Sequence, residues 1–414
     1  MNPISSRNIQ LDILRGIAIL LVIGRHVELP RPGGLAGEFA YRWYQIGWIG
    51  VDLFFVLSGF LIGGLLIKEF AKNGRIRISR FLIRRGLKIY PLYFLFIAYV
   101  ILWPAVKALK SGGELFPTFT SQWSLYWPNL LFLQNYIGTN PAGHTWTLAV
   151  EEHFYLILPF ALVTLIATKR IRWLIPICIL MVPVFLGFRC FSVYIDNPYA
   201  VSMAATHLRL EALLFGVGLR GIAEMHPARF AAFRRWRLPL LIFGLACWFP
   251  NFILDPSTVF VRTLGLTGTL LGSAAFLVAT LHTHASDFAG SRKLVTSAAR
   301  VVSWIGVFSY GIYLWHVTTI GILERVISDR ILTTPGEVTT MEWLLITTLV
   351  TIGVIASGAF ISRVIEWPVL RFRDRFFPSL SGPTDAIGGS RTSSGERHPE
   401  PTAQAPTRGT TPGI

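Results

Sequence analysis

Residues 10–26 read QLDILRGIAILLVIGRH, a stretch that is long and apolar enough to cross a bilayer as a helix. Ionisable residues, among them Asp12, Arg15 and His26, interrupt it, and such side chains are costly in hydrocarbon. Because a helix turns about 100° per residue, His26 falls within about 20° of Arg15, and Asp12 lies about 60° from Arg15. The three side chains therefore share one stripe, on which Arg15 and His26 stand about 16 Å apart. This spacing suits a long ligand with an anionic end and a reactive end.

The whole chain has the composition of an integral membrane protein. Its 414 residues are 52% hydrophobic and only 14% charged, with a mean hydropathy of +0.54, which exceeds what a soluble domain of this size needs for its core. The positive-inside rule accounts for the net charge of +16, so nucleic-acid binding is not expected. Cysteines are few and lack paired spacing, so neither a disulfide framework nor a metal site is expected.

Apolar segments of spanning length predict an all-α integral membrane protein, a bundle of about ten transmembrane helices. The weakest segment is the sixth, which is short and carries charged residues. The ten predicted segments are residues 9–27, 46–67, 89–108, 147–167, 171–191, 208–223, 238–254, 258–281, 303–325 and 343–368.

The distribution of basic residues predicts the orientation in the inner (plasma) membrane. Residues 68–88, after the second span, carry eight Lys or Arg, and the loops after the fourth, sixth and eighth spans are also richer in them than the opposite loops. Both termini are therefore expected to be cytoplasmic. Residues 1–377 are predicted to form one membrane domain. Residues 378–414, rich in Pro, Gly, Ser and Thr, are predicted to form a disordered cytoplasmic tail.

Under this topology the intramembrane polar residues separate by depth into two groups. The outer half collects groups suited to proton transfer, namely His26, Asp52, Glu151, Glu152 and His316. The inner side collects cations suited to phosphate binding, namely Arg15, Arg84, Arg85 and Lys88. Structural alternatives exist: a helix-end role for His26, structural hydrogen bonding for Asp52, and a topology signal for the basic loop.

Seven ordered blocks of the sequence resemble those of the family 3 membrane acyltransferases, polytopic proteins that O-acylate cell-surface glycans and some small secreted molecules. The blocks extend from about residue 8 to about residue 370, nearly all of the predicted folded chain. They read LDILRGIAILLVIGRH, GVDLFFVLSGFLI, FLIRRGLKIYPLYF, HTWTLAVEEHFYLILP, HLRLEALLFGVGL, FSYGIYLWH and IEWP.

The resemblance implies roles for particular residues. The family's functional Arg and His, separated by ten residues, fall on Arg15 and His26. Its basic motif has a third arginine where this chain has Lys88, which keeps the charge but loses the bidentate fork. Its span-four motif has a serine where this chain has Thr147, which keeps a hydroxyl. Further positions that match the family are Arg84, Arg85, Asp12, Asp52, Glu151 and His316.

The resemblance implies transfer of an acyl group, acetyl being the first expectation, from acyl-CoA to a hydroxyl of a saccharide or glycan outside the cytoplasm. No permanently bound cofactor is expected, and acyl-CoA is the donor substrate. His26 would act as general base or as a transient acyl carrier, with Glu151, Glu152 or Asp52 stabilising the imidazolium. Asp12 is expected to pair with Arg15 instead. Some relatives carry a further periplasmic hydrolase-like domain, so direct transfer or a separate periplasmic partner is implied here.

Two questions stay open at the level of the sequence. A secondary transporter or flippase, in which the same histidines and carboxylates relay protons, is the alternative function, although no internal repeat is apparent. The acceptor is also undetermined, since lipopolysaccharide O-antigen, exopolysaccharide, a lipid-linked sugar and a macrolide-like metabolite all fit.

Overall fold

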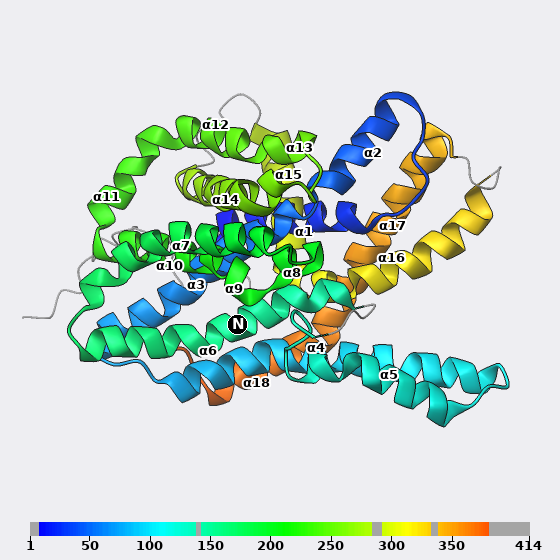
Figure 1. Cartoon of the computed structure of the whole chain (residues 1–414), viewed down its shortest axis with the longest axis horizontal. Helices are drawn as coiled ribbons and strands as arrows, with labels where there is room; N and C mark the ends of the chain where they lie inside the picture. The colour runs from blue at the N-terminus through cyan, green and yellow to red at the C-terminus, as the bar shows by residue number, and fades with distance from the viewer. Residues whose placement is uncertain (1–7, 138–141, 284–291, 333–337, 381–414) are drawn as a thin grey trace, which may run out of the picture.

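The computed structural model describes residues 8–137, 142–283, 292–332 and 338–380 (Figure 1). Within these residues the regular structure is helical, without strands. Short 3₁₀ or π turns join several of the helices, including π turns at Val261–Gly265 and Ser362–Glu366. The α-helices are α1 (Ile9–His26), α2 (Gly34–Ile46), α3 (Ile49–Asn73), α4 (Ile78–Lys110), α5 (Leu115–Leu130), α6 (Trp146–Ala167), α7 (Leu174–Tyr194), α8 (Tyr199–Ala204), α9 (Thr206–Arg209), α10 (Glu211–Met225), α11 (Pro227–Ala232), α12 (Arg237–Trp248), α13 (Pro250–Ile253), α14 (Leu266–Leu281), α15 (Arg292–Val307), α16 (Ser309–Ile331), α17 (Thr340–Ile361) and α18 (Trp367–Phe376).

Membrane-spanning helices dominate the fold, which confirms the prediction of an all-α membrane protein. Judged by length and hydropathy, the described residues contain seven candidate spans, or eight if the bent pair α15 and α16 is one span. This is fewer than the ten that the sequence predicts. Helix α1 is not among the candidates, since its 18 residues include three charged ones, and α10 has only 15 residues. The predicted disordered tail lies outside the described residues from residue 381 onward.

Helix α1 packs against five other helices, namely α2, α3, α14, α15 and α16. The Asn8 side chain begins α1 by accepting hydrogen bonds from the backbone N–H groups of Gln10 and Leu11. Close approach to α15 requires glycine, because a Cβ on Gly306 would lie 1.8 Å from the Asp12 carbonyl oxygen. The charged stripe of α1 is thereby fixed inside the bundle.

The pair α3 and α10 is a second tightly packed element, and two buried ion pairs lie close to it. A Cβ on Gly59 of α3 would lie 1.9 Å from the Leu213 carbonyl oxygen, so the helices meet backbone to backbone. Arg209 donates to both carboxylate oxygens of Asp52 at 3.0 Å. Arg189 donates to Glu211 in a second buried pair. These contacts tie α3, α7 and the α9–α10 segment together.

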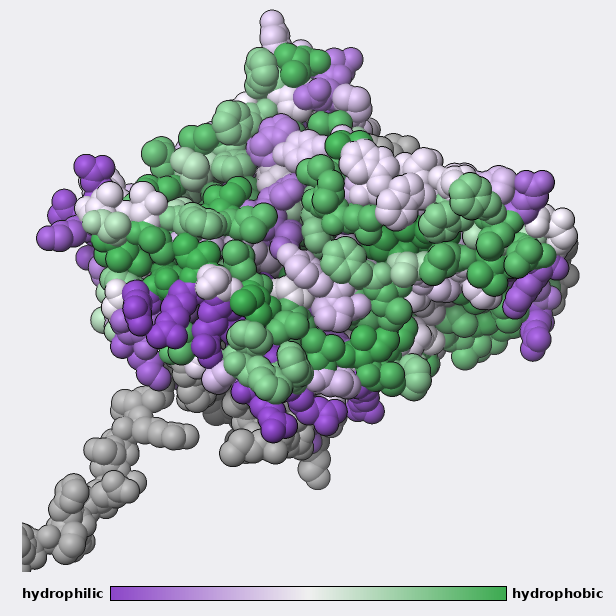
Figure 2. Space-filling view, turned by 90° about the horizontal axis from the view of Figure 1, so that it is seen from below, coloured by the Kyte–Doolittle hydropathy of each residue, from purple (hydrophilic) through white to green (hydrophobic). Residues whose placement is uncertain are grey.

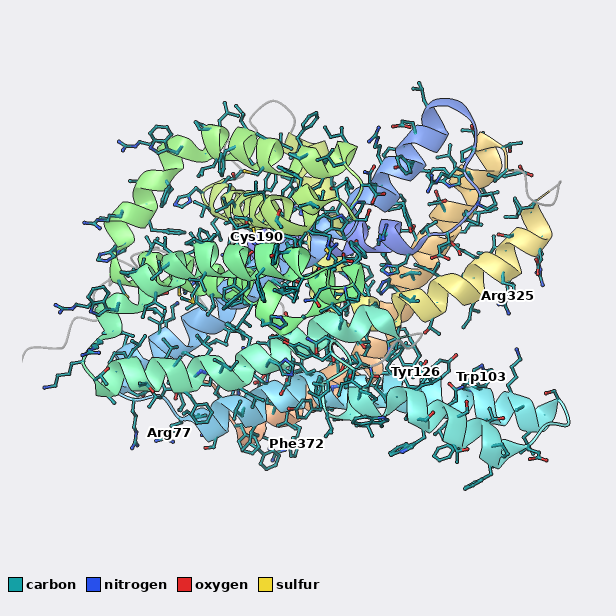
Figure 3. All side chains as sticks on the ribbon, in the orientation of Figure 1. Arg77, Trp103, Tyr126, Cys190, Arg325 and Phe372 are labelled. Carbon is teal, nitrogen blue, oxygen red and sulfur yellow. The ribbon has the colours of Figure 1, made fainter. Side chains whose placement is uncertain are left out.

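The surface matches a protein surrounded by lipid. Figure 2 shows one face on which apolar side chains cover broad areas on both sides of a paler, partly hydrophilic band, while the most hydrophilic ones gather toward its edges. The long helices α6 and α7 run roughly along the horizontal axis of Figure 1. Arg77, before α4, and Arg325, in α16, lie toward opposite ends of that axis (Figure 3). The polar ends and apolar flanks are those of a bilayer-spanning bundle.

Candidate active site

The first element of the site is the ion pair that the sequence predicts on α1. The Arg15 guanidinium donates to the Asp12 carboxylate at 3.2 Å, one helical turn earlier. Asp12 is buried, whereas the Arg15 side chain keeps 27% of its surface exposed. The ion pair orients Arg15 while leaving part of the guanidinium accessible to a ligand.

A cavity of about 140 Å³ extends from Arg15 into the bundle. Its charged lining comes from elements far apart in the sequence: Arg15 of α1, Arg85 and Lys88 of α4, Glu151 of α6, and Glu366 of the π turn before α18. Mainly apolar residues of α3, Gly306 and Val307 of α15, and polar residues of α6 and α16 complete the walls. The polar residues of α6 and α16 are Thr147, Tyr155, Ser309, Tyr310 and Tyr313.

The two adjacent arginines of the basic motif separate in the structure. Arg85 lines the cavity, and its guanidinium lies over the rings of Phe81 and Tyr155 at 5.8 and 5.9 Å. Arg84 instead donates to the Asp374 carboxylate at 3.1 Å and to the Phe377 carbonyl. Consecutive helix residues point about 100° apart, which explains the difference. Arg84 thus contacts the chain around α18 and does not line the cavity.

The two adjacent glutamates separate in the same way. Glu151 lines the cavity, and its carboxylate accepts a hydrogen bond from Tyr155 at 3.0 Å and interacts electrostatically with Lys88 and Arg85. Glu152 accepts a hydrogen bond from Tyr90 and is buried away from the cavity. Of the two carboxylates, Glu151 is the one that a ligand in the cavity would meet.

Three histidines form a cluster at the end of α1. The ring of His316 lies 4.7 Å from that of His26 and 5.1 Å from that of His144, in edge-to-face contacts. His316 is fully buried and His144 is nearly so, whereas His26 is only half-buried. His26 is therefore the member of this cluster that a substrate can reach. The residues that the structure describes contain no group of three His, Cys, Asp or Glu side chains arranged to hold a metal ion.

Backbone carbonyls set the tautomers of this cluster, because a carbonyl oxygen can only accept. His26 Nδ1–H donates to the Val22 carbonyl at 3.0 Å, and His316 Nδ1–H donates to the Tyr313 carbonyl. His316 Nε2 therefore carries a lone pair, which lies 3.2 Å from His26 Nδ1. The remaining nitrogen of His26, Nε2, is left with its lone pair and has the protonation of a general base.

The cavity and the histidine cluster adjoin one another through Tyr313. Its hydroxyl lies 2.6 Å from Thr147 Oγ1 and donates to the His144 carbonyl. Its ring centroid lies 5.5 Å from that of His316. Tyr313 and Thr147 therefore form the boundary between the cavity and the histidines.

Asp52 does not join the site, which corrects its expected role as a partner of His26. Both of its oxygens accept from Arg209, and the pair is buried. The printed sequence gives no sign of this pairing, because 157 residues separate the two. His316 takes the place expected for a carboxylate, as the side chain that contacts His26 Nδ1.

Residues of the site that were not among the sequence candidates include His144, Tyr313 and Glu366. All three lie inside blocks that resemble the family, HTWTLAVEEHFYLILP, FSYGIYLWH and IEWP. A signal was therefore present, since an ionisable or hydroxyl-bearing residue in an apolar span is a candidate by default.

Comparisons with known sequences identify the family of the chain. The sequence model of a family described as "Acyltransferase domain" matches residues 8–362. The chain is 28% identical over 376 residues to the peptidoglycan O-acetyltransferase OatA of Listeria monocytogenes, covering 87% of this chain and 55% of the relative. No solved structure matches the chain.

Two further relatives have similar names. A Staphylococcus aureus protein named "Putative O-acetyltransferase" is 27% identical over 340 residues, covering 77% of this chain and 52% of the relative. The "Putative peptidoglycan O-acetyltransferase YrhL" of Bacillus subtilis is 26% identical over 344 residues, covering 75% and 48%. The chain spans about half the length of these relatives. Because the family match covers most of the chain, this protein belongs to the acyltransferase domain family.

Proposed function

We propose that this protein transfers an acyl group, acetyl in the first instance, from acyl-CoA to a hydroxyl of a saccharide. One observation carries the proposal: a single cavity begins among Arg15, Arg85 and Lys88 and ends at Tyr313 and Thr147, beside the histidine cluster. An elongated donor with an anionic end and a reactive thioester matches this order of cationic and then hydroxyl-bearing side chains along the cavity. The family match supports the enzyme over a transporter or flippase.

The donor's phosphates would bind to the cationic end of the cavity. Arg15, Arg85 and Lys88 supply three positive charges there, against the carboxylates of Glu151 and Glu366. Charge-assisted hydrogen bonds to phosphate are the strong class of such bonds, and arginine provides two at once. The cavity beyond them suits the extended pantetheine arm of CoA. Arg84 has only a supporting role in this proposal, since Asp374 and Phe377 occupy its donors.

His26 would act as general base. Its Nε2 lone pair removes the proton of the acceptor hydroxyl as the oxygen attacks the thioester carbonyl. The C–S bond then breaks, and the imidazolium returns the proton to the departing CoA thiolate. The charge on His26 is stabilised by the hydrogen bonds from its Nδ1–H to the Val22 carbonyl and to the His316 lone pair.

The acceptor class is proposed from the relatives, two of which carry peptidoglycan O-acetyltransferase in their names. A glycan hydroxyl therefore fits best as acceptor. The acceptor would approach from the extracytoplasmic side, because His26 is at the end of α1 away from Arg15 and the basic loop. A separate periplasmic protein that receives the acyl group is compatible with this reaction.

The reaction requires an orientation, and ten spans with both termini in the cytoplasm provide it. Seven candidate spans and the bent pair α15 and α16 make eight. Helix α1, whose charged stripe belongs to the site, and the short α10, whose charges are paired within the bundle, complete ten. Residues 1–377 would form this plasma-membrane domain, with residues 378–414 as a cytoplasmic tail.

The test is acyl transfer in isolated membranes, using radiolabelled acetyl-CoA and the cell's own surface glycan, normalised to the amount of folded protein. His26→Gln keeps size and some hydrogen bonding but cannot take the proton, so we expect transfer to fall by a factor on the order of 10² to 10⁴. Crosslinking of a photoreactive CoA should persist in this variant.

Two outcomes would overturn the proposal. Near-normal transfer by His26→Gln would remove the base from the mechanism. Absence of transfer by the wild-type protein to any glycan fraction, despite CoA crosslinking, would show that the donor site serves another reaction.

A further inference from the structure

A second cavity lies at the other end of α1 and has no part in the donor site. It measures about 230 Å³ and is lined by Trp43 and Tyr44 of α2, Trp343 of α17, and Glu28 and Arg31 of the segment after α1. Figure 1 shows α2 and α17 side by side, and the ring of Phe39 contacts that of Trp343 across them at 6.4 Å.

We propose that this cavity binds one sugar ring of the acceptor glycan. The inference rests on the proposed transferase function, which it extends from the donor to the acceptor. The cavity is smaller than the roughly 300–1,000 Å³ of drug-sized ligand sites, so it suits a single ring of a longer chain.

The lining chemistry matches a saccharide. Tryptophan and tyrosine rings present apolar faces, against which the C–H face of a sugar ring can pack, and they carry polar edges as well. Glu28 can accept hydrogen bonds from hydroxyl groups and Arg31 can donate to them, and both lie on the rim. A carboxylate and a guanidinium together can hydrogen-bond the several hydroxyl groups of one sugar ring.

The aromatic wall is fixed in place before any ligand arrives. Trp43 Nε1–H donates to the Leu20 carbonyl of α1 at 3.1 Å. Gly24 gives the indole its room, because a Cβ there would lie 2.1 Å from Trp43 Nε1. On the α2 side, Gln45 donates to the Leu254 carbonyl at 2.7 Å. A wall held by hydrogen bonds to two neighbouring segments is preorganised for binding.

The position of the cavity gives it a role in the reaction. Gly24 and Val27, which line it, flank His26 in the sequence. Glu28 is further held by its backbone N–H, which donates to Glu324 of α16 at 3.1 Å. The cavity adjoins the segment that directly follows His26, so a sugar ring held here would lie at the end of α1 that carries the imidazole.

The experiment uses the full chain in nanodiscs and a diazirine-bearing tetrasaccharide of alternating N-acetylglucosamine and N-acetylmuramic acid. Crosslinked peptides are mapped by mass spectrometry, and the KM values for the tetrasaccharide and for acetyl-CoA are measured separately. The variants are Trp43→Leu and Glu28→Gln. The matched control is Trp123→Leu, an exposed tryptophan of α5 that does not line the cavity.

We expect crosslinks within residues 24–44 and at Trp343. Loss of ring stacking in Trp43→Leu should raise the KM for the tetrasaccharide about tenfold, while the KM for acetyl-CoA and the Trp123→Leu control stay unchanged. Glu28→Gln keeps an acceptor oxygen but loses the charge, so its effect should be smaller.

Crosslinks elsewhere, or an equal loss in Trp43→Leu and Trp123→Leu, would overturn the proposal and assign these rings to membrane anchoring. Labelling that phospholipid headgroups compete away, and free tetrasaccharide does not, would assign the cavity to lipid. If the wild-type protein transfers no acetyl group while the crosslinks map to the cavity, the binding site stands and the proposed transferase function fails.

Discussion

The contact between His26 and His316 gives the sharpest prediction about catalysis. His316 is fully buried, and its Nε2 lone pair lies 3.2 Å from His26 Nδ1. We expect His316→Leu, which is similar in size but offers no acceptor, to slow transfer without abolishing it. His316→Gln, which keeps an acceptor oxygen, should retain more activity.

The magnitude follows from the hydrogen bond that is lost. A hydrogen bond to a charged group contributes about 1.5–3 kcal/mol, and each 1.36 kcal/mol is tenfold in rate, so kcat should fall about 10- to 150-fold in His316→Leu. The Val22 carbonyl still accepts from His26 Nδ1 in this variant, which favours the lower half of that range. The KM for acetyl-CoA should stay close to the wild-type value, because His316 does not line the donor cavity.

The assay is the initial rate of radiolabelled acetyl transfer by purified protein in nanodiscs at saturating acetyl-CoA. Rates are divided by the amount of monodisperse protein. Replacing His316 also removes the hydrogen-bond donor of the Tyr313 carbonyl, so the melting temperature of each variant is measured to detect a loss of stability. Wild-type kcat in His316→Leu would refute the reasoning. A raised KM for acetyl-CoA with unchanged kcat would also refute it, since His316 would then act on the donor.

Three further predictions concern the donor site, a buried ion pair and the topology. Arg85→Ala should raise the KM for acetyl-CoA about tenfold in membrane assays. Arg84→Ala should leave this KM nearly unchanged, because, of the two arginines, only Arg85 lines the cavity. Equal effects of the two variants would contradict the different roles assigned to these arginines. Asp52→Ala should destabilise the protein by about 3–5 kcal/mol, which lowers its melting temperature, while the kcat of the protein that stays folded remains near the wild-type value. A wild-type melting temperature together with a loss of kcat would instead indicate a catalytic role for Asp52. Reporter fusions at Asn73 and Ser111 should report opposite sides of the membrane, and the same side for both would contradict the topology.

Local features of the site could be predicted from the sequence. The Asp12–Arg15 ion pair follows from helical spacing, and the structure forms it. The charged stripe of α1 follows from the same spacing, and Arg15 lines the cavity. In these cases the partners are within one or two turns of each other, so the geometry of a helix decides the contact.

Contacts between distant helices could not be predicted in this way. His26 and His316 are 290 residues apart, and no periodicity relates them. The separation of Arg84 from Arg85, and of Glu152 from Glu151, depends on which side of α4 and α6 faces the bundle. Both helices are apolar over most of their surface, so hydropathy gives little information about that choice.

The buried ion pairs also have a consequence for how the chain enters the membrane. The α9–α10 segment carries Arg209, Glu211 and Arg220, and each such charge costs about 2.5–3.5 kcal/mol at the centre of an isolated membrane helix. Its partners Asp52 and Arg189 belong to α3 and α7, which precede it in the chain. During synthesis both are made before α9–α10 leaves the ribosome. The segment can therefore insert directly against these opposite charges, and a variant that lacks both Asp52 and Arg189 should insert this segment less efficiently, before any tertiary packing begins.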